Sequence, residues 1–83
     1  MTMEALDGNA IAGILWDYFG REMTTATGSC RHCGASARIA ELSVYGQAPG
    51  TVVRCRACGG VVIVAVQSPG GLDVHLTGFE LGT

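Results

Sequence analysis

The four cysteines of the chain form two pairs of identical spacing, CRHCG at residues 30–34 and CRACG at residues 55–59. A gap of two residues lets one tight turn direct both sulfurs at the same ion, and the glycine after each pair suits a backbone position with positive φ. Two such turns supply four thiolates, the ligand set of a closed tetrahedral zinc site. The pattern therefore predicts one zinc ion bound by Cys30, Cys33, Cys55 and Cys58.

Disulfides or a redox-active pair would use the same four cysteines. Disulfides need an oxidising compartment, and residues 1–7 lack the positive cluster and apolar run of a secretory signal. A redox-active CxxC is expected at the start of a helix, whereas each pair here adjoins strand-like sequence. We therefore expect a cytoplasmic protein that binds metal. The longest apolar run, residues 61–66, is too short to span a bilayer, so no membrane association is expected.

The length of 83 residues favours one small domain over residues 1–83. A domain of this size buries only about 60–65% of the surface of its unfolded chain, and it often needs a metal, a disulfide or a partner as a staple. We expect a helix at residues 7–20 and an antiparallel β zinc ribbon with rubredoxin-like knuckles at residues 23–81. This arrangement is a small α+β fold.

Residues 7–20 have the period of an amphipathic helix. Asp7 suits the N-cap position, and Gly20 suits the left-handed residue that ends a helix. Trp16 and Ala12 widen the apolar arc, so this helix requires burial on more than one side. We therefore expect a protein partner, or self-association, through the N-terminal helix. The side chains predicted to share its main apolar face are Ile11, Ile14, Leu15, Tyr18 and Phe19.

About five short strands are expected after the helix, joined by hairpins. Threonine content, β-branched runs and alternation predict the extended segments. They lie at residues 23–27, 37–45, 51–53, 61–66 and 72–77. The continuously apolar run at 61–66 predicts a strand covered on both faces. Turn signals with Pro and Gly occur at residues 46–50 and 68–71.

Basic residues around the cysteines are candidates for contacts with a partner or with nucleic acid. They are Arg31, Arg38, Arg54 and Arg56, with Glu41 as the only acid between Gly28 and Gly60, which gives this segment a charge of 4 − 1 = +3 without metal. A nucleic-acid contact is one hypothesis. Compensation of a negatively charged metal centre is the other, and we favour it because phosphate binding usually draws on more basic residues and the whole chain has a net charge of −2.

The cysteine arrangement resembles that of zinc ribbons and also that of rubredoxins, which hold one iron between two CxxCG knuckles. The resemblance to rubredoxins is limited to the cysteines and the glycines Gly34 and Gly59. Ala57 stands where rubredoxins commonly have a proline, and the chain lacks their acidic, aromatic-rich character. Zinc is therefore expected, and a rubredoxin-like iron electron carrier is the minority alternative.

Beyond the knuckles, the chain is similar to a family of short bacterial zinc-ribbon proteins without an assigned activity. The resemblance runs through Leu6–Ala10 and Glu22–Gly28 to both knuckles. It implies a zinc-ribbon fold and a bacterial origin.

No arrangement of residues in the sequence predicts catalysis. Four cysteines fill the coordination shell of zinc and leave no open position for water. His32 is expected at the surface of a knuckle, and Asp73 and His75 on the exposed face of a strand. We therefore expect a structural zinc-binding protein that acts in protein interactions and is not an enzyme, with nucleic-acid binding as the alternative.

Overall fold

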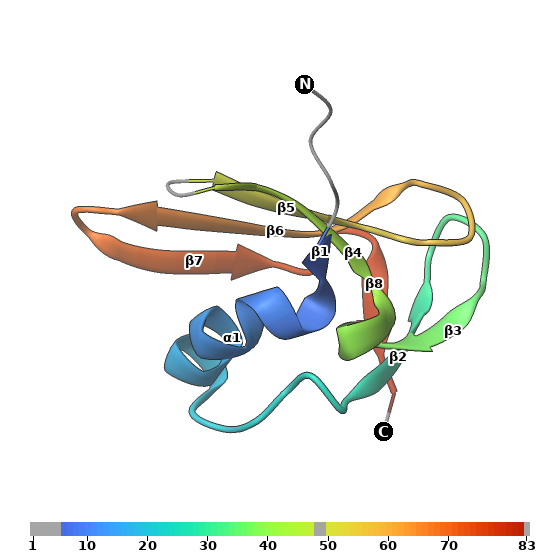
Figure 1. Cartoon of the computed structure of the whole chain (residues 1–83), viewed down its shortest axis with the longest axis horizontal. Coiled ribbons are helices and arrows are strands. Elements are labelled where there is room, and N and C mark those ends of the chain that lie inside the picture. Colours follow the sequence, from blue (N-terminus) through green and yellow to red (C-terminus); the bar gives the residue numbers. More distant parts are fainter. Residues whose placement is uncertain (1–5, 48–49, 83) are drawn as a thin grey trace.

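The computed structural model describes residues 6–47 and 50–82, and in them one short helix packs against mostly antiparallel strands in two sheets (Figure 1). The larger sheet has the strand order β1-β4-β5-β6-β7. Its strands are β1 Leu6–Asp7, β4 Ser43–Gln47, β5 Gly50–Arg54, β6 Val61–Ser68 and β7 Gly71–His75. The smaller sheet has the order β3-β2-β8, with β2 Thr27–Cys30, β3 Ser36–Arg38 and β8 Phe79–Leu81. These elements confirm a small α+β fold.

The helix predicted at residues 7–20 forms, but its α-helical part is shorter than predicted. A 3-10 turn, η1 Gly8–Ile11, leads into the α-helix α1 Ala12–Phe19. The Asp7 carboxylate accepts a hydrogen bond from the Asn9 backbone N–H at 3.1 Å and so caps the first turn. Gly20 has φ of 74° and donates its N–H to the Trp16 carbonyl oxygen at 2.7 Å. The chain therefore leaves the helix through the left-handed residue that glycine allows.

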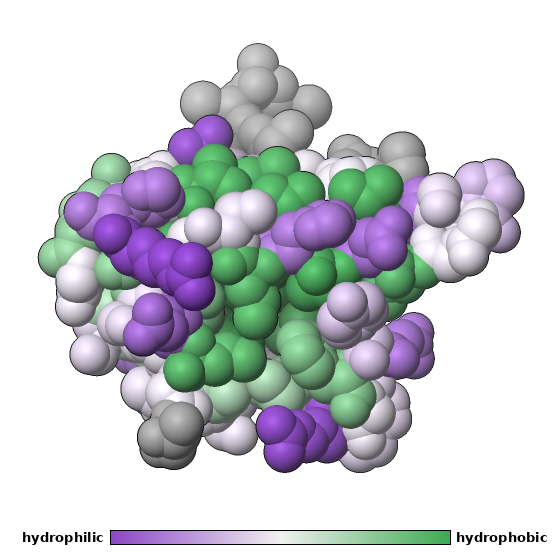
Figure 2. Space-filling model, turned by 180° about the vertical axis from the view of Figure 1, so that it is seen from behind, coloured by the Kyte–Doolittle hydropathy of each residue, from purple (hydrophilic) through white to green (hydrophobic). Residues whose placement is uncertain are grey.

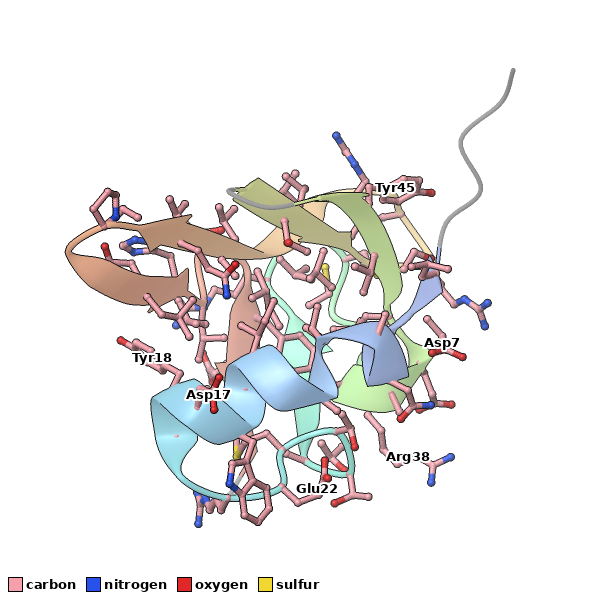
Figure 3. The ribbon with its side chains drawn as sticks, turned by 60° about the vertical axis from the view of Figure 1, so that its left-hand side comes forward. Asp7, Asp17, Tyr18, Glu22, Arg38 and Tyr45 are labelled. Atoms are coloured by element: carbon pink, nitrogen blue, oxygen red, sulfur yellow. The ribbon has the colours of Figure 1, made fainter. Side chains whose placement is uncertain are left out.

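The hydrophobic core lies between α1 and the face of the larger sheet that this helix covers (Figure 1, Figure 3). Leu15 contributes from the helix, and Val53 and Ile63 contribute from the two central strands. Full burial of such a side chain stabilises a fold by about 1.5–3 kcal/mol. The side chains that are at most 2% exposed are Ile11, Leu15, Ile39, Leu42, Val53, Val62, Ile63 and Phe79.

Two aromatic side chains of α1 lie outside this core. Trp16 is 54% exposed and Tyr18 is 47% exposed. The prediction that Tyr18 shares the buried face is therefore wrong. Phe19 takes the inward direction in the last turn and packs on the core, and the Tyr18 ring meets it edge-on with centroids 5.1 Å apart.

Apolar residues also gather across the middle of the face seen in Figure 2, between polar residues on either side.

The strand predicted at residues 23–27 is wrong, because local hydrogen bonds turn this segment before β2 begins at Thr27. The Glu22 carboxylate accepts from both the backbone N–H and the hydroxyl of Thr24, at 2.9 and 2.5 Å. Ala26 then donates its N–H to the Met23 carbonyl oxygen at 3.0 Å. Side chains that bond their own backbone compete with sheet pairing in this way, and threonine composition does not reveal it.

The single strand predicted at residues 37–45 is also wrong. A 3-10 turn, η2 Ile39–Glu41, separates β3 from β4 and carries the chain from the smaller sheet to the larger one. The Arg38 backbone N–H donates to the Glu41 carboxylate at 2.8 Å, which closes a capping box around the turn. Ile39, the first residue of the turn, and Leu42, the residue after it, are both buried, so their apolar character reflects packing in the core and not a continuous strand.

The later strands follow the sequence more closely. The segments predicted at 51–53, 61–66 and 72–77 correspond to β5, β6 and β7. β6 is covered on both faces only in its first half, since Val62 and Ile63 are fully buried whereas Val66 is 37% exposed. The turn predicted at 46–50 includes residues 48–49, which lie outside the described residues. Strand β8 is not predicted by the sequence pattern.

Within residues 6–47 and 50–82, no helix has the length and apolar character needed to cross a membrane.

Candidate metal centre

The two cysteine turns, one after β2 and one after β5, bring all four sulfurs to one place. Each of the four ligand atoms lies within 4.8 Å of the others. Two distances between the turns are shorter, 3.7 Å from Cys30 Sγ to Cys58 Sγ and 3.8 Å from Cys33 Sγ to Cys55 Sγ. A disulfide requires about 2.05 Å, so these cysteines are free. The structure thus brings together all four cysteines that the sequence nominates as ligands.

The sulfur spacing fits a tetrahedral metal ion. Metal–sulfur bonds of about 2.3 Å directed at the corners of a tetrahedron place neighbouring sulfurs about 3.8 Å apart. The two closest pairs, Cys30–Cys58 and Cys33–Cys55, have this spacing. The four cysteines could therefore hold one metal ion.

Both turns repeat the same backbone geometry. Gly34 donates its N–H to the Cys30 carbonyl oxygen at 2.8 Å, and Gly59 donates to that of Cys55 at 2.9 Å. The two glycines have φ of 80° and 77°, in the left-handed region that favours glycine. The sequence repeat of a glycine after each pair therefore corresponds to a structural repeat, and it confirms the predicted reason for Gly34 and Gly59.

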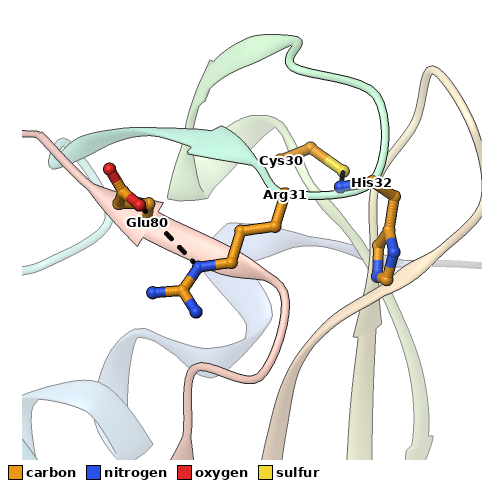
Figure 4. Close-up of polar contacts among 4 residues, drawn as sticks. All are labelled: Cys30, Arg31, His32 and Glu80. Carbon is orange, nitrogen blue, oxygen red and sulfur yellow. Dashed lines mark hydrogen bonds and ion pairs between the residues drawn. The ribbon is translucent and has the colours of Figure 1, made fainter.

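Backbone N–H groups point at the sulfurs, and they change the acidity of Cys30. Burial by itself raises the pKa of the Cys30 thiol, but hydrogen bonds from the backbone N–H groups of Cys33 and His32 and from neighbouring thiols lower the pKa to about 6. The His32 N–H lies 3.4 Å from Cys30 Sγ (Figure 4). In the second turn, the Gly60 N–H lies at the same distance from Cys58 Sγ. These donors stabilise the thiolate form, which is the form that binds metal.

The crowding of the sulfurs has the opposite effect on Cys33. The Ala35 backbone N–H lowers the pKa of the Cys33 thiol, but burial and the sulfurs of Cys58, Cys30 and Cys55 raise the pKa to about 11. Adjacent thiols that share the first negative charge resist a second one, because like charges at this distance repel. A cation at the centre would remove this repulsion.

The first cysteine of each turn is buried and the second is exposed. Cys30 is 3% exposed and Cys55 is 6% exposed, whereas Cys33 and Cys58 lie at the surface. The centre therefore joins the protein interior to an outer edge formed by the two turns.

Among the four arginines named by the sequence, Arg31, Arg38 and Arg54 have partners within the protein. Arg54 donates to the Gly59 carbonyl oxygen at 2.8 Å, and its guanidinium carbon lies 6.0 Å from the centroid of the Tyr45 ring. It thus ties strand β5 to the second cysteine turn.

Arg31 and Arg38 each lie beside an acid. Arg31 Nε is 3.9 Å from the Glu80 carboxylate on β8 (Figure 4), and Arg38 Nε is 3.6 Å from that of Glu41. Both pairs are exposed, so each contributes little to stability. The hydrogen bond from the Arg38 N–H and the charge of the Arg38 side chain lower the pKa of the Glu41 carboxyl, and the charge of Arg56 has the same effect.

Arg56 lines a pocket of about 200 Å³ between β3 and the second cysteine turn. Glu41, Leu42 and Cys55 also line this pocket. The carboxylate of Glu41 is already engaged by the Arg38 backbone N–H, so the pocket offers no free pair of opposite charges.

His32 has a positioning role that the sequence does not reveal. His32, drawn in Figure 4, lies at the surface, as predicted, but its Nε2 is 2.9 Å from the Val61 carbonyl oxygen at the start of β6. A Cβ at Gly60 would lie 2.6 Å from the ring, and a Cβ at Gly78 would lie 2.8 Å from its Nε2. The ring of His32 therefore fits against two residues without side chains and links the first cysteine turn to β6. The only sequence signal is the second glycine of the pair Gly59-Gly60.

Asp73 and His75 lie exposed on β7, as predicted. In the described part of the chain, the four cysteines are the one group of three or more His, Cys, Asp and Glu side chains close enough to hold an ion. Asp73 and His75 therefore form no second metal site with a further ligand.

Comparison with known proteins connects the whole fold to one family. Residues 2–82 match a family model described as a family of unknown function, DUF6510. No curated protein and no solved structure matched the chain.

Proposed function

The chain belongs to the DUF6510 family, and we propose that it is a small structural protein built around one zinc ion in a zinc ribbon. The observation that carries this proposal is the convergence of Cys30, Cys33, Cys55 and Cys58, whose sulfurs lie within 4.8 Å of one another and form two pairs at tetrahedral spacing. Four sulfurs complete the shell of zinc, so no position remains for an activated water. A role in catalysis is therefore not part of the proposal.

Zinc would act here by holding distant parts of the chain together. The two cysteine turns end β2 and follow β5, and these strands belong to different sheets. A bound zinc ion supplies folding free energy of about 10–16 kcal/mol in finger peptides, which is comparable to the whole stability of a small domain. A reducing cytoplasm would keep the four cysteines from forming disulfides, so a cytoplasmic location is part of the proposal.

The proposed cellular role is interaction with another protein. Trp16, Tyr18 and Leu6 are 54%, 47% and 59% exposed, although each is large and apolar. Aromatic side chains of this kind are enriched at protein interfaces. These three residues motivate the proposal that the N-terminal part of the chain meets a partner.

Nucleic-acid binding is the competing proposal, and the arginine contacts weigh against it. Arg54 is committed to the Gly59 carbonyl oxygen, and Arg31 and Arg38 lie beside Glu80 and Glu41. Binding to an oligonucleotide that falls steeply with salt, and that Arg56→Ala weakens, would support the competing proposal instead.

Metal analysis of the purified chain tests the zinc proposal directly. We expect one equivalent of zinc in colourless protein, and unfolding when a strong chelator removes it. Ser36→Ala on the exposed part of β3 is a matched control and should retain the metal. Red protein with one equivalent of iron and reversible one-electron chemistry would favour the rubredoxin-like alternative. Metal-free protein that is as thermally stable as the metal-bound protein would contradict both the zinc proposal and the iron alternative.

A further inference from the structure

Among the residues that the structure describes, strand β7 is an edge of the larger sheet and has no strand on its outer side. It pairs with β6 on one side. The paired residues run from Val64 opposite His75 to Ser68 opposite Gly71, and β7 is the last strand in the sheet order. Figure 1 shows the β6–β7 hairpin extending away from the cysteine end of the molecule. An edge strand presents unpaired N–H and C=O groups to any other chain that can align with it.

The register of the hairpin identifies the residues whose backbone groups face outward. The pair Ser68–Gly71 closes a two-residue loop, so its members bond to each other across the hairpin. Hydrogen-bonded and non-bonded pairs then alternate along the ladder. Asp73 and His75 therefore direct their backbone groups at β6, whereas Leu72 and Val74 direct theirs away from it. The Val62 carbonyl oxygen accepts from the Gly78 N–H at 3.0 Å, which agrees with this alternation.

The side chains of β7 complement a second copy of the same strand. Asp73 and His75 are exposed on the sheet face opposite α1, and Val74 between them is buried on the other face. If two β7 strands align antiparallel with Val74 opposite Val74, each Asp73 lies opposite His75 of the other copy. An alignment centred on residue 73 would place Asp73 opposite Asp73 of the other copy. An alignment centred on residue 75 would place His75 opposite His75.

The backbone and the side chains select the same alignment. Leu72, Val74 and Leu76 would form the hydrogen-bonded pairs, and Asp73 and His75 would meet in non-bonded pairs. Side chains lie closest in non-bonded pairs, where the His75 imidazole of one copy can donate a hydrogen bond to the Asp73 carboxylate of the other. We propose that two copies of this chain associate through their β7 edges, antiparallel and centred on Val74, to form one continuous sheet.

Exposed apolar surface beside the edge is consistent with a second copy. Tyr18 is 47% exposed on α1, the helix that packs under β7. Figure 3 shows Tyr18 directed outward on the side of the molecule where β7 forms the edge. Leu72 and Leu76 are only partly buried on the same side of the sheet as α1. A second copy would cover these side chains together with the backbone groups of the strand.

Sedimentation velocity over micromolar to millimolar concentrations tests this interface on the full chain with its metal. We expect association to twice the 8.5 kDa chain mass. His75→Asp should raise the dissociation constant about tenfold, because it creates two like-charged pairs across the interface. The double variant Asp73→Lys with His75→Asp should restore association, because it places opposite charges across the interface. Trp16→Ser is the matched control and should leave the dissociation constant unchanged.

Amide hydrogen exchange at high and low protein concentration reports the register without any substitution. The Leu72 and Val74 amides should gain protection as concentration rises, whereas the Asp73 and His75 amides should be protected throughout. A monomer at every concentration would overturn the proposal. Association that Trp16→Ser abolishes and His75→Asp leaves intact, or that leaves Leu72 and Val74 unprotected, would also overturn it.

Discussion

The two ends of this small protein are held together by different forces. At the end formed by α1 and the larger sheet, Leu15, Val53 and Ile63 have no exposed surface, and ordinary apolar packing joins the elements. At the cysteine end, Cys33 and Cys58 are exposed, and short glycine-containing turns replace packed side chains. Because the second end buries little apolar surface, its order must come from another source, and the four convergent sulfurs provide one.

The comparison explains how so short a chain forms two sheets. The larger sheet and α1 bury enough apolar surface to pack on each other, whereas β3 has no buried side chain and β8 has one, Phe79. We therefore expect metal loss to disrupt the cysteine end first, and core substitutions to act mainly at the other end.

Replacement of a single cysteine should have the largest effect. Cys33→Ser and Cys30→Ser should both abolish stoichiometric metal binding and leave the chain unfolded or aggregated, because either change removes one of four thiolates. Metal content and circular dichroism of the purified variants check this result.

These two variants also separate a ligand from a packing residue. Cys30 is buried and Cys33 is exposed, so packing alone would make Cys30→Ser costly and Cys33→Ser harmless. Equal loss of metal in both variants is the result that we expect. A stable, metal-binding Cys33→Ser protein would contradict a four-sulfur centre.

A core substitution at the other end should have the next largest effect. Leu15→Ala should lower the free energy of unfolding by about 2–5 kcal/mol, because it leaves a cavity under the larger sheet. Trp16→Ala, at the adjacent exposed position, is the matched control and should change stability far less. Denaturant unfolding measures both, and metal stoichiometry should remain one equivalent. Equal destabilisation by the two variants would contradict the placement of α1.

Substitutions at the contact between His32 and Gly60 should have an intermediate effect on stability. Gly60→Ala should destabilise the metal-bound protein by about 1–3 kcal/mol, because its new Cβ would overlap the His32 ring. His32→Ala should relieve that overlap, so the double variant should be more stable than the sum of the two single effects predicts. A double-mutant cycle in denaturant measures this coupling, and strict additivity would show that His32 does not pack there.

The arginines should have the smallest effects and differ from one another. Arg54→Gln should cost about 0.5–1.5 kcal/mol of stability, because it removes the hydrogen bond to the Gly59 carbonyl oxygen. Arg56→Gln, two residues further along the chain and beside the pocket, should leave stability nearly unchanged. Thermal unfolding of the two variants at equal metal content compares them. An equal cost for both would remove the distinction between Arg54 as a structural residue and Arg56 as a surface residue.

The cysteine site could be predicted from the sequence because its information is local. The spacing within each pair and the glycine that follows it fix both turns, and residue type fixes the ligand atoms. The start of the helical segment and the end of α1 could be predicted for the same reason, since Asp7 caps η1 and Gly20 ends α1 through local contacts.

The errors arose where contacts between distant or competing groups decide the structure. Glu22 bonds Thr24 and turns the segment that was predicted to be a strand, and Glu41 bonds Arg38 and interrupts the next one. Strand β8 forms because Phe79 is buried against the core and aligns with Cys30, and neither contact has a periodic signature in three residues. His32 meets Val61 across 29 positions, a separation that no local pattern reports.

X-ray absorption at the metal edge of the purified chain tests the central claim most directly. The account predicts zinc surrounded by four sulfur atoms at about 2.3 Å, without a nitrogen or oxygen neighbour. A first shell with fewer than four sulfurs, or with a nitrogen or oxygen atom in place of one, would contradict it.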